Sequence, residues 1–261
     1  MAMRKYLLLP QVIRLSLGAP RDPRQAWERY WSEIGSTGPH GQVLWDADVR
    51  GELDATVARL RVHGDMGLPL VDLGSGNGRQ ARALAAYTSR VVGLDAAESA
   101  VRRATDESEG VPNVEFRVAD VTQPDLGECL AAELGDANVH LRGVLHEVDD
   151  AHRPAAVANI HALVGKRGVV HLCETDVRGD ALEYLQAVGV TPTSMPDVVR
   201  RLVSSGVRPP SHFGDAELAT FFPAETWRIL ASGPTTMYGV PLTPGGPLQQ
   251  LPSFFAVLRR R

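Results

Sequence analysis

Short apolar runs alternate with amphipathic stretches over most of the chain after Leu68. The runs have the length of buried strands, and the stretches between them repeat their apolar positions with helical spacing. Strands are predicted over residues 68–73, 90–95, 113–118, 138–145, 168–174, 226–238 and 253–259. Helices are predicted near 77–87, 97–107, 125–134 and 151–164. This alternation predicts an α/β fold with a doubly wound, mostly parallel sheet of seven strands and crossover helices on both faces.

The segment ahead of the first strand is also predicted to be helical. Pro23 suits the first turn of a helix that runs to Ile34, and Asp22 suits its cap. A second helix is expected from Asp46 to about Val62. Residues 1–66 are therefore predicted to form an N-terminal helical unit.

A second departure from the regular alternation follows the fifth strand. Residues 178–213 are longer than a strand-to-helix connection requires, and they contain helical stretches over 181–188 and 196–205. We predict that this insertion caps the active site of a domain spanning residues 67–261. The alternative is a surface decoration away from the pocket.

Composition and charge narrow the function classes. The chain of 261 residues is 44% hydrophobic, which supports a full core, and its net charge of −4 gives no broad reason to bind nucleic acid. Cys129 and Cys173 are the only cysteines, so neither a disulfide framework nor a thiolate metal cluster is indicated and a cytoplasmic location is expected. The apolar residues near the start are interrupted by Pro10 and Arg14, so no membrane span is predicted.

A glycine-rich turn joins the first strand to the first helix of the alternation. It reads Asp72-Leu73-Gly74-Ser75-Gly76-Asn77-Gly78-Arg79. Glycines let the backbone approach a ligand with no Cβ in the way, and the free N–H groups of the first helical turn can hold an anion. The turn therefore predicts a cradle for a small molecule.

The next strand ends in Asp95, an acidic side chain at the height where a ribose would lie. A dinucleotide site would need the spacing G-x-G-x-x-G, but Arg79 stands where the third glycine should be. The fingerprint for a pyrophosphate is therefore not met.

At these residues the sequence resembles the class I S-adenosylmethionine-dependent methyltransferases, whose first motif is an acidic residue followed by G-x-G-x-G. The resemblance implies a Rossmann-like fold whose last two strands pair antiparallel, and residues 23–62 as a lid across the pocket mouth. It implies Asp95 on the ribose and Asp120 on the adenine amino group. The residues it assigns to S-adenosylmethionine are Asp72, Gly74, Ser75, Gly76, Gly78, Asp95, Ala96, Asp120, Val121 and Arg142.

The stretch from Arg142 to Glu147 resembles a signature of the small-molecule O-methyltransferases. In that signature a basic residue precedes V-L-H-[DE], and a later strand ends in an acid, which here is Glu174. The resemblance implies that His146 takes a proton from the substrate hydroxyl while Glu174 orients it. A histidine suits that task because it titrates near neutral pH. The resemblance covers residues 68–175, and the 67 residues ahead leave no room for the long dimerisation domain of the plant enzymes, so a homodimer stays open.

The leading hypothesis is thus methyl transfer to a hydroxyl of a small molecule, in the manner of secondary metabolism. N- or C-methylation is the first alternative, because an amine or activated carbon needs less from a base. A nicotinamide-dependent oxidoreductase and a non-catalytic S-adenosylmethionine-binding protein are the others. No metal is expected, since Arg142-Gly143 stands where a magnesium-dependent enzyme needs carboxylates. Trp27, Tyr30 and Trp31 form a helical stripe that suits core packing better than ligand contact.

Overall fold

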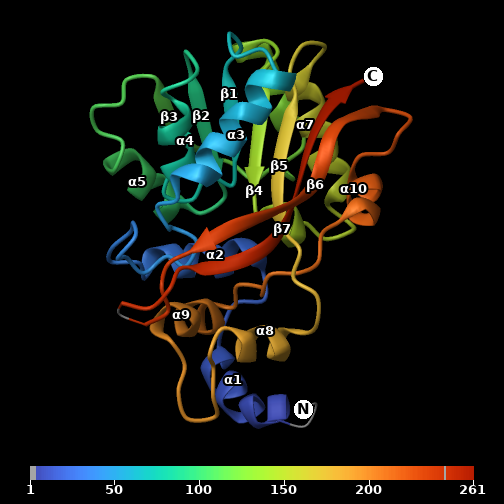
Figure 1. Cartoon of the computed structure of the whole chain (residues 1–261). Coiled ribbons are helices and arrows are strands. Elements are labelled where there is room, and N and C mark those ends of the chain that lie inside the picture. Colours follow the sequence, from blue (N-terminus) through green and yellow to red (C-terminus); the bar gives the residue numbers. More distant parts are fainter. Residues whose placement is uncertain (1–3, 244) are drawn as a thin grey trace.

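A computed structural model describes residues 4–243 and 245–261, and its centre is a seven-stranded sheet (Figure 1). The strand order is β3-β2-β1-β4-β5-β7-β6; the first five strands pair in parallel, and β7 is antiparallel to both β5 and β6. The strands are β1 Leu70–Leu73, β2 Val91–Asp95, β3 Val114–Val118, β4 Asn138–Arg142, β5 Val170–Thr175, β6 Trp227–Gly239 and β7 Gln249–Arg260. The predicted fold, including the antiparallel last pair, is confirmed.

Helices cover both faces of the sheet because alternate strand residues point to opposite sides. Leu70 belongs to an apolar cluster beneath α3 (Arg50–His63) and α4 (Arg79–Leu84). The next residue, Val71, belongs to a larger cluster on the other side. That cluster is covered by α6 (Leu126–Leu134), α7 (Arg153–Val164) and α10 (Asp215–Phe221), while α5 (Glu98–Asp106) packs beside β2 and β3.

A further helical layer lies across the carboxyl ends of the parallel strands, in the lower half of Figure 1. It combines the N-terminal η1 (Arg4–Leu8), α1 (Leu9–Ser16) and α2 (Pro23–Ser32) with α8 (Ala181–Ala187) and α9 (Asp197–Ser205) of the insertion. Leu8 packs with Tyr184 and Val199 in one apolar cluster, so the two parts share a small core. The ammonium group of Lys5 pairs with the carboxylates of Asp180 and Glu183.

Several predicted boundaries are wrong. The fourth strand was expected to reach residue 145, but it ends at Arg142, because Gly143 (φ +69°) turns the chain and Leu145–Glu147 form a 3-10 helix. The helix expected from Asp46 begins at Arg50. Asp215 is the first residue of its helix rather than the cap, which is Gly214.

The described residues form no helix long and apolar enough to cross a membrane. Both cysteines are free: Cys129 is exposed and Cys173 is buried in β5.

Candidate active site

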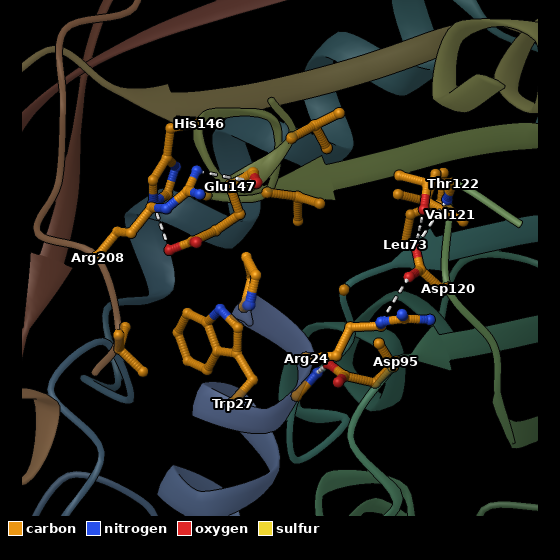
Figure 2. Close-up of a pocket in the computed structure, with 18 of the residues that line it drawn as sticks. Arg24, Trp27, Leu73, Asp95, Asp120, Val121, Thr122, His146, Glu147 and Arg208 are labelled. Carbon is orange, nitrogen blue, oxygen red and sulfur yellow. Dashed lines mark hydrogen bonds and ion pairs between the residues drawn. The ribbon is translucent and has the colours of Figure 1, made fainter. Parts of the chain in front are cut away.

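A cavity of about 800 Å³ opens at the carboxyl ends of the parallel strands, between the sheet and the helical layer (Figures 1 and 2). Open α/β sheets bind ligands at this edge. Eight of the twelve residues predicted for the site line the cavity: Gly74, Gly76, Asp95, Ala96, Asp120, Val121, Arg142 and His146. The other four, Asp72, Ser75, Gly78 and Glu174, lie behind its wall.

The glycine turn has a backbone conformation that side chains rarely adopt. The φ angles of Gly74, Gly76 and Gly78 are +71°, +54° and +74°. A Cβ at Gly74 would lie 2.5 Å from the Val144 side chain, and one at Gly76 would lie 2.8 Å from the ring of Trp31. Glycine is therefore required here both by conformation and by close packing.

Asp95 ends β2 and braces this turn from the side. Its Oδ2 accepts from the backbone N–H of Gly76 at 2.8 Å, and its Oδ1 accepts from that of Ala97 at 2.9 Å. Burial raises the pKa of Asp95 to about 6, although these two hydrogen bonds act in the opposite direction. Each oxygen keeps acceptor capacity for one further donor from the cavity.

Asp120 follows β3 on the neighbouring wall. Its Oδ1 accepts from the backbone N–H and the hydroxyl of Thr122, at 2.8 and 2.7 Å. Its Oδ2 lies 3.6 Å from Nε of Arg24 in α2, as Figure 2 shows. The pair joins the sheet edge to the helical layer across the cavity mouth.

Asp72 is buried beneath the turn, and its Oδ2 has no hydrogen-bond partner among the described residues. Burial, together with the charge of Asp95, raises the pKa of Asp72 to about 8. The side chain is therefore largely protonated at neutral pH.

Arg142 ends β4 and lines the cavity while holding a buried ion pair. Its Nε donates to Oε1 of Glu52 at 2.5 Å, and Oε2 of Glu52 accepts from the backbone N–H of Tyr238 at 3.1 Å. Sequence reasoning missed Glu52, since nothing local shows that α3 brings it to a residue 90 positions later.

His146 lies in the 3-10 turn after β4 and faces the cavity (Figure 2). Its Nδ1 lies 3.1 Å from Oε2 of Glu174, while Oε1 of Glu174 accepts from the backbone N–H groups of Val144 and Leu145 at 2.8 and 3.0 Å. The Glu174 carboxylate is fully buried, so it depends on these partners. An Nδ1–H that donates to Glu174 leaves the lone pair of Nε2 free, which is the tautomer that a general base needs.

Burial alone would lower the pKa of His146, but the hydrogen bond and charge of Glu174 outweigh burial and the pKa is raised. His146 Nε2 also lies 3.6 Å from Oε1 of Glu147, an atom with no hydrogen-bond partner among the described residues. Burial raises the pKa of Glu147 as well.

Three cavity residues near His146 were given no role by the sequence. Glu147, Trp27 and Arg208 stand together in Figure 2, and Nη1 of Arg208 donates to the backbone carbonyl of Glu147 at 3.4 Å. The acidic position of V-L-H-[DE] was the one available signal for Glu147. Trp27 lines the cavity, whereas Tyr30 is wholly buried, so the aromatic stripe of α2 serves both packing and the cavity wall.

Comparisons with known proteins agree on one family. The family described as a methyltransferase domain matches residues 70–168, the part that carries the glycine turn, both acidic residues and His146. A solved S-adenosylmethionine-dependent methyltransferase from Anabaena variabilis is 27% identical with a TM-score of 0.80, over 93% of this chain and 97% of that one. The chain is a class I S-adenosylmethionine-dependent methyltransferase. No curated protein matches it significantly.

Other solved methyltransferases share only the fold with this methyltransferase. Magnesium protoporphyrin IX methyltransferase from Synechocystis, solved with bound S-adenosylhomocysteine, is 19% identical with a TM-score of 0.51, over 80% of this chain and 82% of that one. The 1,6-didemethyltoxoflavin N1-methyltransferase of Burkholderia thailandensis is 18% identical with a TM-score of 0.51, over 80% and 77%.

The cofactor of this methyltransferase is S-adenosylmethionine, and its residues fit that group. Gly74 and Gly76 present bare backbone to the cavity, and the carboxylates of Asp95 and Asp120 stand at successive strand ends with acceptor capacity left over. The described residues contain no group of three or more His, Cys, Asp or Glu side chains with the geometry of a metal site.

Proposed function

We propose that this methyltransferase transfers a methyl group to a hydroxyl of a small molecule, with His146 as the general base. The observation that carries the proposal is the hydrogen bond between His146 Nδ1 and the fully buried Glu174, which leaves Nε2 available to the cavity. A neutral hydroxyl is a weak nucleophile, so its proton must leave as the new bond forms. An amine or an activated carbon would not need such a pair.

Bound S-adenosylmethionine supplies a methyl carbon that its sulfonium activates toward in-line displacement. The protein's task is then to align the acceptor, remove the hydroxyl proton and keep water out. His146 Nε2 receives the proton, and the negative Glu174 stabilises the imidazolium that results. Trp27 and Trp45, which line the cavity near the helical layer, contribute apolar wall that excludes water.

The cofactor contacts belong to the same proposal. Asp95 accepts from the ribose hydroxyls, and Asp120 accepts from the adenine amino group beside Val121. Gly74 and Gly76 lie against the methionine half, with Arg142 at its far end. Both carboxylates are held by backbone N–H groups, so they are oriented before the ligand arrives.

The helical layer is proposed to form the acceptor end of the pocket. Trp27 of α2, Tyr184 of α8 and Leu202 of α9 all line the cavity, so the N-terminal segment and the insertion near 178–213 both contribute. Within residues 1–66, α3 instead packs on the sheet beside α4, so we assign the lid to α1 and α2. A cavity enclosed by apolar walls suits a small acceptor, and the Synechocystis and Burkholderia enzymes are named for acceptors of that class.

The test uses S-adenosylmethionine labelled with ¹³C in the transferred methyl group and matched sets of phenols, aliphatic alcohols, anilines and methyl ethers. The carbon chemical shift of the product distinguishes O-, N- and C-methyl groups in a single spectrum. We expect an O-methyl product from a hydroxyl acceptor and none from its methyl ether. An N- or C-methyl product, formed while the hydroxyl counterparts stay unreacted, would contradict the proposal.

A further inference from the structure

A second cavity, of about 370 Å³, lies on the face of the sheet that α3 covers. Its walls come from α3, from the ends of β4 and β5, and from the middle of β6. The side chains that matter for its chemistry are Glu52, Thr56, Arg59, His140, Arg142 and Thr236. Arg142 lines this cavity and the active-site cavity alike.

Arg59 is the cation of this cavity that no carboxylate neutralises. Its Nη2 lies 3.4 Å from the hydroxyl of Thr235, and its guanidinium lies 3.5 Å above the ring of Phe255. Among residues 4–243 and 245–261 it makes no ion pair. Half-buried charges are usually paired, so this guanidinium calls for a negative partner.

Glu52 is the acid nearest at hand, but its oxygens are occupied. One accepts from Arg142 and the other from the backbone of Tyr238. Glu52 therefore neutralises Arg142 and leaves the charge of Arg59 over.

A buried histidine adds a second polar group without a partner. His140 lines the cavity, is 1% exposed, and has no hydrogen-bond partner for Nε2 in the described part of the chain. Its Nδ1 lies 3.1 Å from Nδ1 of His171, so one proton is shared between two neutral rings. When His171 donates that proton, Nε2 of His140 carries a hydrogen and becomes a donor toward the cavity.

We propose that this second cavity binds a small oxyanion, a carboxylate or a phosphate group, with Arg59 as its main charge partner. A guanidinium matches either group in a bidentate manner, and Nε2–H of His140 and the Thr236 hydroxyl are further donors. The anion selects the His140 tautomer that donates. Because Arg142 borders both cavities, occupancy here is coupled to the methionine end of the cofactor site.

The experiment is calorimetric titration of inorganic phosphate, and separately of acetate, into enzyme saturated with S-adenosylhomocysteine at constant ionic strength. Saturating the active site keeps the probe out of the first cavity, and the readout needs no methyl acceptor. The variants are Arg59→Met, which keeps the packing on Phe255, Arg59→Lys, which restores the charge, and Arg228→Met, which removes an exposed arginine of β6 outside the cavity.

We expect saturable binding of at least one anion, with the affinity at least about tenfold weaker in Arg59→Met, partly restored in Arg59→Lys and within about twofold of wild type in Arg228→Met. Whichever probe binds tighter identifies the oxyanion as a phosphate or a carboxylate. Absence of saturable binding for both anions, or equal affinity in wild type and a folded Arg59→Met, would overturn the proposal. A failure here leaves the hydroxyl-acceptor proposal untouched, since that rests on His146.

Discussion

Nδ1 of His146 lies 3.1 Å from Oε2 of Glu174, and the other oxygen of the same carboxylate holds the backbone of Val144 and Leu145. One buried acid thus fixes both the turn that carries the histidine and the orientation of its ring. The turn needs this support because the strand has already ended at Arg142. The geometry of the base is therefore set before any acceptor binds.

The pH dependence of turnover should reflect the raised pKa of His146. The base must be deprotonated, so the rate on a hydroxyl acceptor should rise with pH. Because Glu174 raises this pKa, the midpoint should lie above the ordinary histidine value of 6.5. A profile of kcat against pH with saturating acceptor measures it.

Glu174→Gln is the variant that tests the cause of this shift. Glutamine keeps an oxygen for the two backbone N–H groups but removes the charge that raises the pKa, so burial should pull the midpoint to lower pH. Turnover should fall by less than in a variant without the histidine. A midpoint that does not move would show that Glu174 does not control the titration.

Asp95→Ala should weaken the binding of S-adenosylmethionine by roughly 10- to 100-fold, because two ribose hydroxyls lose an acceptor and the N–H of Gly76 is released. Calorimetric titration measures the dissociation constant. Asp106→Ala, at an exposed position near the end of α5, is the control and should bind as wild type does. Equal affinities in the two variants would remove Asp95 from the cofactor site.

Gly76→Ala should reduce cofactor affinity more than the cost of its backbone angle alone. A Cβ there lies 2.8 Å from the Trp31 ring, whereas a Cβ at Gly110, with φ of +86°, meets nothing within 4 Å. Gly110→Ala therefore carries the conformational cost, about 1 kcal/mol, without the clash. If the two variants lose equal stability and bind the cofactor equally well, the packing of α2 on the turn does not matter for binding.

Asp72→Asn should stabilise the protein at neutral pH. The pKa of Asp72 is about 8 in the folded protein against an ordinary aspartate value of 3.8, so the free energy of unfolding of the wild type falls as pH rises from about 4 to about 8. Asparagine cannot ionise, and the gain at pH 8 should be about 1–3 kcal/mol, less than the full shift implies at about 1.4 kcal/mol per pKa unit. Denaturant unfolding at pH 4 and pH 8 should show the gain at pH 8 only, and Asp106→Asn should show it at neither.

Much of the sheet could be predicted from the sequence because buried parallel strands are continuous apolar runs. The glycine turn was equally legible, since its positive φ angles admit few other residues. The end of the fourth strand was not. Val144 and Leu145 are apolar because they pack against the core of the sheet, and periodicity alone cannot distinguish that from a continuing strand.

The residues that complete the cavity depend on contacts between distant segments. Glu52 meets Arg142 across 90 positions, and Arg24 meets Asp120 across the cavity mouth. No local pattern marks such pairs. The association of Leu8 with α8 and α9 was missed for the same reason, because each helix shows an apolar face but not its partner.

The most direct measurement of the central claim is the turnover of His146→Ala on the hydroxyl acceptor, with cofactor affinity measured in parallel. Loss of the base should lower kcat by roughly 10²–10⁴-fold while the dissociation constant of S-adenosylmethionine stays within about twofold. His40→Ala, at an exposed histidine outside the cavity, should match wild type in both quantities. A His146→Ala enzyme that binds the cofactor and methylates the hydroxyl at a near wild-type rate would contradict the assignment of His146 as the base.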